Sequence, residues 1–247
     1  MIRFPDEFSD LLTPYGLRIL NGDIDSARAL FKGTGRYFIT FNNVIDKERA
    51  GSCLQILDEH LYEFLAVEQR RIPPESITQM KKNYSEQLSK TMRIKTAFFL
   101  RKNARSYQAA ERIGLLRMMR SESFVRFAEA VTGYELDRPW HVQVSCYEQG
   151  DYAGPHNDHH PEFESFRRGF IDLHVMFAND AVAYHYLVYE ENQHFSKILD
   201  INKQGAVSVY KLPFWHYTTP LAAKRGRERQ ARRWLLLGTF SISEANK

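Results

Sequence analysis

The chain has 247 residues, of which 43% are hydrophobic, 26% charged and 13% aromatic, and its formal net charge is +4. This composition is typical of a globular protein with a core of its own, and two cysteines in unrelated contexts exclude a disulfide-stabilised scaffold. No stretch approaches the roughly 20 apolar residues of a membrane span, and the N-terminal residues lack the apolar core of a secretory signal. These features predict a cytoplasmic protein without membrane association.

The first structured region along the chain combines a β-prone run with a long helix. Residues 36–41 (RYFITF) favour a strand, and Asp46 then stands where the N-cap of a helix is expected. The apolar residues that follow recur at helical spacing. They are Ala50, Cys53, Leu54, Leu57, Leu61 and Phe64. We expect this helix to bury one face.

Further helices are predicted before residue 135. One begins at about Ser76, with an apolar stripe formed by Ile77, Met80, Tyr84, Leu88 and Met92. Two more are expected at residues 107–119 and 122–132, the latter with Ser121 as its N-cap and Gly133 at its end. Residues 1–135 are therefore predicted to be mainly helical support.

From His141 onward the sequence changes to short β-prone runs separated by turn residues. The runs are 141–148, 172–180, 181–190, 205–212, 214–219 and 232–240. This texture is typical of a sandwich, barrel or jelly roll. Because no repeat, low-complexity tract or linker separates the two halves, we predict one domain, 1–247, with a β core in residues 136–247.

The first β-prone run shows how that core would be organised. One of its faces carries only apolar side chains and the other carries polar ones: Val142, Val144 and Cys146 against Gln143, Ser145 and Tyr147. We expect the apolar face to pack on the core and the polar face to line a cavity.

The positive charge is concentrated in residues 224–233. This segment holds six basic residues and one glutamate, a net +5, which leaves −1 for the rest of the chain. Nucleic-acid binders usually distribute basic residues over a face with aromatic residues between them, and here the first aromatic residue is Trp234. We interpret the segment as an exposed connection between strands; a loop that covers substrate or binds an acidic partner is the alternative.

Two of the nine histidines precede a carboxylate by two residues: His156 with Asp158, and His160 with Glu162. Residues two apart in an extended strand point to the same face, so the first pair can bind one metal ion. Pro161 removes a backbone donor and fixes φ in the second pair, which disfavours it. We therefore favour His156 and Asp158 as ligands.

Two ligands do not complete an octahedral site. His216 lies in an aromatic, β-prone run sixty residues after His156, and a neighbouring strand of a jelly roll can return to the same place. Two imidazoles and one carboxylate on one face form a facial triad, which suits non-haem Fe(II). Among the other histidines, His174 and His185 are expected to pack around the site, and His159 and His160 are candidates for substrate contact.

The segments around the candidate metal ligands and Arg233 resemble those of a known protein family. Residues 147–158 (YEQGDYAGPHND) resemble the YxxGxxxxxHxD segment of the 2-oxoglutarate- and Fe(II)-dependent oxygenases, particularly the prolyl-4-hydroxylase-like branch. Residues 216–221 are similar to the HxVxPV segment of that branch, and residues 233–235 resemble the start of its last core strand. The resemblance covers residues 136–240 in order. It departs at 183–186, where many members carry a Gly-Gly pair, and in a longer interval before Arg233.

The resemblance implies an α+β double-stranded β-helix, or jelly roll, with N-terminal supporting helices. It also implies Fe(II), 2-oxoglutarate as co-substrate and stimulation by ascorbate. The implied metal ligands are His156, Asp158 and His216. The distal carboxylate of 2-oxoglutarate would pair with Arg233, because a guanidinium can bind a carboxylate through two parallel hydrogen bonds. Arg232, which points to the opposite face, is the alternative, and Tyr147 is a further candidate for co-substrate binding.

The implied reaction is hydroxylation of an unactivated C–H bond in an amino acid, a peptidyl residue or a small polar metabolite, with 2-oxoglutarate converted to succinate and CO₂. Asp158 favours hydroxylation over halogenation, because related halogenases carry a small residue there. Nucleic-acid dealkylation is one alternative; those enzymes typically carry a second Arg where Thr239 stands. A non-catalytic, cupin-like metal-binding or sensor module is the other. The residues leave the prime substrate and the oligomeric state open.

Overall fold

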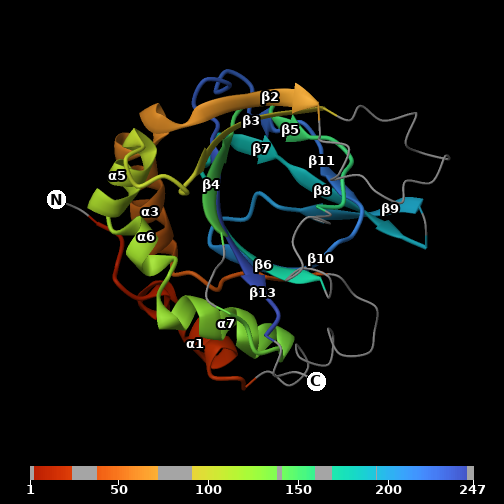
Figure 1. Ribbon diagram of the computed structural model, residues 1–247. Coiled ribbons are helices and arrows are strands. Elements are labelled where there is room, and N and C mark those ends of the chain that lie inside the picture. Colours follow the sequence, from red (N-terminus) through yellow and green to blue (C-terminus); the bar gives the residue numbers. More distant parts are fainter. Residues whose placement is uncertain are drawn as a thin grey trace.

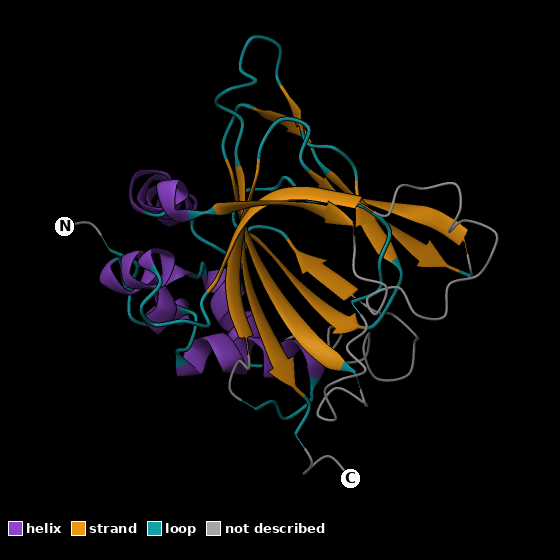
Figure 2. Ribbon diagram, turned by 45° about the horizontal axis from the view of Figure 1, so that its top comes forward, coloured by secondary structure: helices purple, strands orange, loops and turns teal. Residues whose placement is uncertain are grey.

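A strongly curled antiparallel sheet forms the centre of the molecule (Figure 2). The computed structural model describes residues 3–23, 38–71, 91–137, 141–158, 169–192 and 194–243. In spatial order the strands are β1 (Phe38–Phe41), β10 (Ala206–Leu212), β6 (Phe170–Ala178), β13 (Arg233–Ser241), β4 (His141–Tyr147), β3 (Thr91–Phe98) and β2 (Ala66–Arg71), and β5 (Tyr152–Ala153) also pairs with β3.

Two smaller sheets complete the β core. One consists of β11 (His216–Thr218), β8 (Tyr186–Glu191) and β9 (His194–Asp200), and the other pairs β12 (Ala222–Ala223) with β7 (Val182–Tyr184). The large sheet curls toward β8 and β11, so that its concave face looks at them (Figure 1). Side chains from both sheets therefore line one shared cavity.

The helices pack on the convex side of the large sheet, away from β8 and β9 (Figure 1). They are η1 (Phe8–Leu11), α1 (Pro14–Leu20), α3 (Lys47–His60), η2 (Tyr62–Phe64), α5 (Arg105–Arg112), α6 (Leu115–Met118) and α7 (Glu122–Thr132). The predicted caps are confirmed: Asp46 accepts from the first turn of α3, Ser121 accepts from the N–H of Phe124, and Gly133 ends α7 in the left-handed conformation.

The alternation predicted for β4 is confirmed. Val142, Val144 and Cys146 are buried in the core that the sheet shares with the helices, whereas Gln143, Ser145 and Tyr147 line the cavity. Both cysteines are free and buried, as expected. The predicted fold class, α+β with a jelly-roll core and supporting helices, is confirmed, and none of the described helices is long and apolar enough to cross a bilayer.

Several element predictions need correction. The helix expected at 107–119 is two helices, because Gly114 adopts φ 78° between α5 and α6. Residues 76–90 of the helix expected from Ser76 lie outside the described residues, but Met92 belongs to strand β3. The run 181–190 is interrupted at His185 between β7 and β8. The first half of the chain thus supplies β1, β2 and β3 to the large sheet as well as its helical support.

Candidate metal centre and its cavity

The concave faces of the sheets enclose a cavity of about 530 Å³. Alternate side chains of β4 and β13 point into it, because every second residue of a strand faces the same side. The three predicted metal ligands and Arg233 all contribute to its lining. The cavity is thus the place where the sequence-predicted groups come together.

His156 and His216 are brought side by side by the backbone. They form an isolated antiparallel bridge, in which the N–H of His156 donates to the carbonyl of His216 at 3.0 Å and the reverse bond is 2.9 Å. Their ring centroids are 4.4 Å apart. This bridge joins segments sixty residues apart in the chain and sets the spacing of two of the three ligands.

Asp158 completes the cluster by a different route from the one expected. We predicted an extended segment from His156 to Asp158, but Asp158 has φ 51°, in the left-handed region, so the two residues are not successive same-face positions of a strand. Its Oδ1 nevertheless lies 3.4 Å from Nε2 of His156, and its Oδ2 lies 3.4 Å from Nε2 of His216. The turn aims the carboxylate back between the imidazoles.

The donor set fits a divalent transition metal. Nδ1 of His156 lies 2.6 Å from the carbonyl of Gly154, and Nδ1 of His216 lies 2.9 Å from that of Phe214. These bonds place a proton on each Nδ1 and leave the Nε2 lone pairs for a metal. Burial, together with the nearby His156, lowers the pKa of His216 to about 4, which keeps its imidazole in the neutral, metal-binding form. The three ligand atoms lie within 4.8 Å of one another.

Arg233 is a buried cation in the same cavity. Arg233 is 2% exposed, and its Nε donates to the carbonyl of Ile201 at 2.6 Å. Among the described residues, no carboxylate lies within ion-pair distance of its guanidinium. The guanidinium carbon is 5.3 Å from the ring centroid of Tyr147, whose pKa burial raises to about 12. A buried charge without a counter-ion is costly, so this position is complementary to an anionic group.

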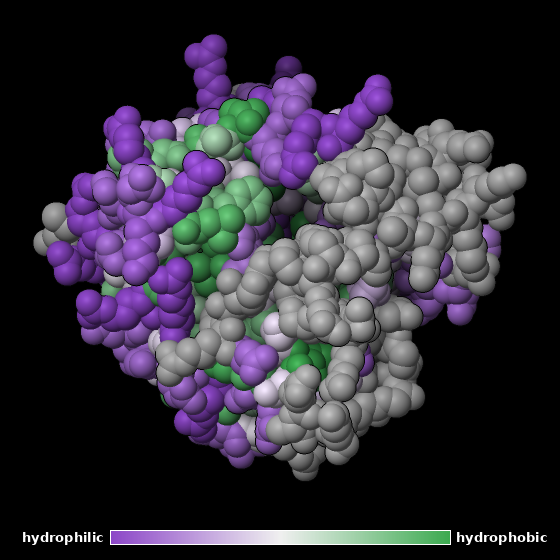
Figure 3. All heavy atoms as spheres, viewed as in Figure 1, coloured by the Kyte–Doolittle hydropathy of each residue, from purple (hydrophilic) through white to green (hydrophobic). Residues whose placement is uncertain are grey.

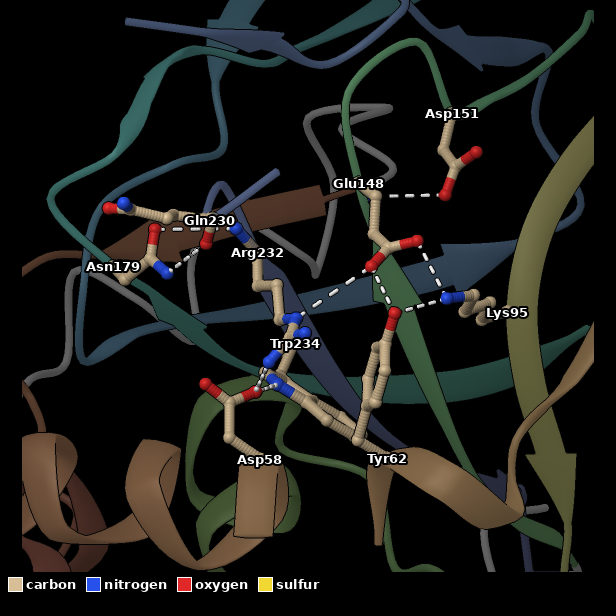
Figure 4. A network of polar contacts seen from close by, with 9 residues as sticks. All are labelled: Asp58, Tyr62, Lys95, Glu148, Asp151, Asn179, Gln230, Arg232 and Trp234. Carbon is tan, nitrogen blue, oxygen red and sulfur yellow. Dashed lines mark hydrogen bonds and ion pairs between the residues drawn. The ribbon is translucent and has the colours of Figure 1, made fainter. Parts of the chain in front are cut away.

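Arg232 points to the other side of β13, into a network of polar contacts (Figure 4). Its guanidinium carbon lies 3.8 Å from the ring centroid of Tyr62, and its nitrogens lie 3.4 Å from Asp58 and 3.7 Å from Glu148. Trp234, on the same side of the strand, donates from Nε1 to Asp58 at 2.8 Å. The position of Arg232, with anionic partners outside the cavity, leaves Arg233 as the cavity arginine.

The remaining histidines separate into different environments. His185 is fully buried against the ring of Tyr147, at 4.7 Å, and burial lowers its pKa well below 6.5. His174, expected to pack around the site, lines the cavity itself. His159 and His160 lie outside the described residues.

Sequence reasoning missed one cavity residue with a clear signal. Asp172 lines the cavity two positions before His174, within the otherwise apolar run 170–178 (FIDLHVMFA). Two polar residues at i and i+2 in an apolar strand indicate a polar face.

Residues 224–230 of the basic segment form a mostly exposed turn between β12 and β13, whereas Arg233 at its end is the buried first residue of β13. Arg227 within the turn binds Asp180 through two hydrogen bonds, from Nη1 at 2.7 Å and from Nη2 at 2.9 Å. Gln230 accepts from the side chain of Asn179 at 2.7 Å. These contacts fit the interpretation as a strand connection.

No family model and no curated protein matches the sequence. Solved structures match over most of their length. A 2OG-Fe(II) oxygenase family oxidoreductase from Burkholderia pseudomallei has a TM-score of 0.55 at 12% identity, over 88% of this chain and 90% of that one. A Trichoplax adhaerens prolyl hydroxylase, bound to a hypoxia inducible factor peptide fragment, has a TM-score of 0.52 at 14% identity, over 93% of this chain and 94% of that one. The alpha ketoglutarate dependent epimerase SnoN of nogalamycin biosynthesis has a TM-score of 0.53 at 12% identity, over 90% of this chain and 83% of that one. At these identities the similarity shows the fold, and it is the fold that the sequence resemblance implied.

Proposed function

We propose that the chain is an Fe(II)- and 2-oxoglutarate-dependent dioxygenase that hydroxylates an unactivated C–H bond of an amino acid, a peptidyl residue or a small polar metabolite. One observation carries this proposal: a single cavity holds both a His-Asp-His cluster and a buried arginine that has no carboxylate partner among the described residues. A metal and a dianionic co-substrate together satisfy both features.

The cluster residues would hold Fe(II) through Nε2 of His156, Nε2 of His216 and the carboxylate of Asp158. Bound together, Fe(II) and 2-oxoglutarate would supply the oxidative decarboxylation that yields succinate and CO₂ and the oxidation of the substrate C–H bond. The backbone carbonyls of Gly154 and Phe214 fix the two ring orientations before the metal arrives.

Arg233 would bind the distal carboxylate of 2-oxoglutarate. Its guanidinium is already oriented by the bond to the Ile201 carbonyl, so little conformational freedom is lost on binding. Tyr147 lines the cavity beside it and stays protonated, because its raised pKa keeps the phenol neutral and able to donate a hydrogen bond. The buried surroundings exclude water and strengthen the ion pair.

The structural neighbours include a hydroxylase and an epimerase by their names, so the fold alone does not select the reaction. The Asp158 carboxylate supports hydroxylation for this chain. The peptide bound to the Trichoplax prolyl hydroxylase supports peptidyl residues as one of the substrate classes.

The test measures succinate formed from 2-oxoglutarate by the Fe(II)-loaded protein in air, together with bound metal. We expect Asp158→Ala and His216→Ala to abolish both metal binding and succinate formation. His194→Ala, which removes an exposed histidine of β9, is the matched control and should retain both. A wild-type protein that binds no metal, or a His216→Ala variant with full occupancy, would contradict the proposal.

A further inference from the structure

We infer that the cavity end marked by Asp172 binds an organic cation, a guanidinium or a primary ammonium group of the prime substrate, with the Asp172 carboxylate as its counter-ion. The inference rests on the proposed function, because it takes this end of the cavity as the place of the prime substrate.

Asp172 belongs to a polar row that crosses four neighbouring strands. On β6 it is paired with Tyr210 of β10 on one side and with Thr239 of β13 on the other, and Thr239 is in turn paired with His141 of β4. All four side chains line the cavity. Directly paired residues share a face of the sheet, so these groups form one continuous polar strip on the cavity wall.

Among the described residues, no Lys or Arg lies within ion-pair distance of the carboxylate in this row. The Asp172 side chain is 8% exposed, and its Oδ1 has no hydrogen-bond partner among the described residues. Its Oδ2 lies 3.7 Å from Nε2 of His174, beyond hydrogen-bonding distance, and that nitrogen is also without a partner in the described structure. A buried carboxylate is costly unless it is paired, so the site is complementary to a cationic group with several N–H donors.

The described lining of the cavity contains two arginines, and neither pairs with Asp172. Arg70 binds Glu68, with Nε 2.5 Å from Oε1. Arg233, the first residue of β13, is paired with Tyr147 of β4. Asp172 is paired with Thr239, which lies six residues after Arg233 on β13. Asp172 therefore lies at a different position along the cavity wall from Arg233.

Asp172 is nevertheless close to the metal cluster. The ring of its neighbour Tyr210 lies 6.1 Å from the ring of His216 and 4.1 Å from that of His174. One side chain thus separates the cation site from a metal ligand. A substrate anchored at Asp172 would present the carbons next to its cationic group to the metal.

The cavity mouth favours a cation on an aliphatic stem. Phe98 and Leu100 contribute to the lining and are 41% and 70% exposed. Hydrophobic residues gather on this face over β3 and β4, beside a hollow in the surface (Figure 3). An arginine or lysine side chain, free or within a peptide, combines an apolar stem with the required charge.

The test is calorimetric titration of the protein loaded with Mn(II) and 2-oxoglutarate. The probes are L-arginine, L-lysine and the end-capped peptides Gly-Arg-Gly and Gly-Lys-Gly. The neutral counterparts, whose central side chain is uncharged, are L-citrulline, L-norleucine and the end-capped peptides Gly-citrulline-Gly and Gly-norleucine-Gly. We expect at least one cationic probe to bind at least tenfold more tightly than its neutral counterpart. The free and peptide arms identify which source of the cation the site accepts.

Asp172→Asn should lower the affinity for that probe at least tenfold, while Asp10→Asn, at an exposed site on η1, should leave it unchanged. Because Asp172→Asn removes a buried charge that has no Lys or Arg partner among the described residues, the melting temperature of the variant should match or exceed that of the wild type. Equal binding of cationic and neutral probes to the wild type would overturn the inference without any variant, as would undiminished binding by Asp172→Asn. Binding of 2-oxoglutarate, measured in the same samples, tests the proposed function separately.

Discussion

Arg233 and Arg232 are adjacent in sequence and opposite in environment. Arg233 is buried in the cavity with one carbonyl partner, and Arg232 lies among Asp58, Glu148 and the ring of Tyr62. Arg232 directly precedes β13 and Arg233 is its first residue. Since side chains of consecutive extended residues alternate, the two arginines do not both enter the cavity. The pair therefore offers a matched comparison of a cavity cation and a network cation.

We predict that Arg233→Gln weakens 2-oxoglutarate binding to the Mn(II)-loaded protein by about 10- to 100-fold, corresponding to ~1.5–3 kcal/mol for a charge-assisted hydrogen bond. Arg233→Lys should recover only part of the loss, because an ammonium lacks the planar fork. Calorimetric titration with 2-oxoglutarate measures both. Arg232→Gln should keep the wild-type affinity; a reversal of this order between the two positions would assign the co-substrate to Arg232.

Some site residues could be predicted from the sequence, and others could not. His156, Asp158 and His216 could be selected as candidate ligands because an HxD pair and a distant histidine match a ligand pattern, and the structure places them together. The backbone bridge and the left-handed turn that join them depend on contacts between distant segments, which spacing does not encode. Asp172 was missed because a single acidic residue in an apolar run has no motif, although its spacing from His174 marks a polar face.

At the scale of elements, the network around Glu148 joins η2, β3, β4 and β13 (Figure 4). Lys95 on β3 lies 2.7 Å from its carboxylate, and the hydroxyl of Tyr62 donates to it. Burial raises the pKa of Glu148, but the bonds from Lys95 and Tyr62 outweigh this and hold it below its ordinary value of 4.5. A lowered folded-state pKa means that ionised Glu148 stabilises the fold.

We therefore predict that Glu148→Gln lowers the free energy of unfolding by about 1–2 kcal/mol at pH 7, with partial solvent access keeping the effect moderate. This contribution is fully present above pH 4.5 and is lost as the pH falls through the lower folded-state pKa. Urea unfolding of both proteins across this range measures the difference. Glu111→Gln, at an exposed site of α5, should show no such dependence, and a gap that persists undiminished in acid would rule out the charge as its cause.

A second contact between elements lies where α7 meets the convex face of β13. A Cβ on Gly238 would come within 2.5 Å of Cε1 of Phe124, a fully buried residue of α7. We predict that Gly238→Ala lowers the free energy of unfolding by about 1–3 kcal/mol, since the packed ring has little room to move. Gly51→Ala on α3, where the nearest atom is 4.0 Å away, should instead stabilise by ~0.5–1 kcal/mol. Denaturant unfolding compares the two; 2-oxoglutarate affinity should change in neither.

Elements with local signals were predictable from the sequence, and those without were not. α3 and α7 begin and end at residues whose side chains or backbone freedom cap a helix. β3 was not predicted, because the apolar residues before it suggested a helical stripe that included Met92. Its strand conformation is stabilised by pairing with β2, β4 and β5, which the spacing of the preceding apolar residues does not reveal.

At the scale of the whole molecule, the candidate metal centre connects the large sheet with the small sheet that faces it. His216 belongs to the small sheet with β8 and β9, whereas His156 and Asp158 follow β5, which pairs with the large sheet. The described link between these two ligand segments includes the bridge of His156 with His216. A metal bound by all three ligands would therefore stabilise the folded state against separation of the two sheets, in addition to any role in catalysis.

Ligand linkage gives the size of this effect. At a free Mn(II) concentration 100 times its Kd, binding to the folded state alone adds ~2.7 kcal/mol, which for a chain of this length raises the melting temperature by about 5–10 °C. We predict this shift for the wild type in a thermal melt, and its loss in His216→Ala and Asp158→Ala. Mg(II), a harder cation that disfavours imidazole ligands, should produce a much smaller shift at the same concentration. If His216→Ala retained the full Mn(II) shift, the stabilising metal would be bound elsewhere, and the two sheets would be held together without it.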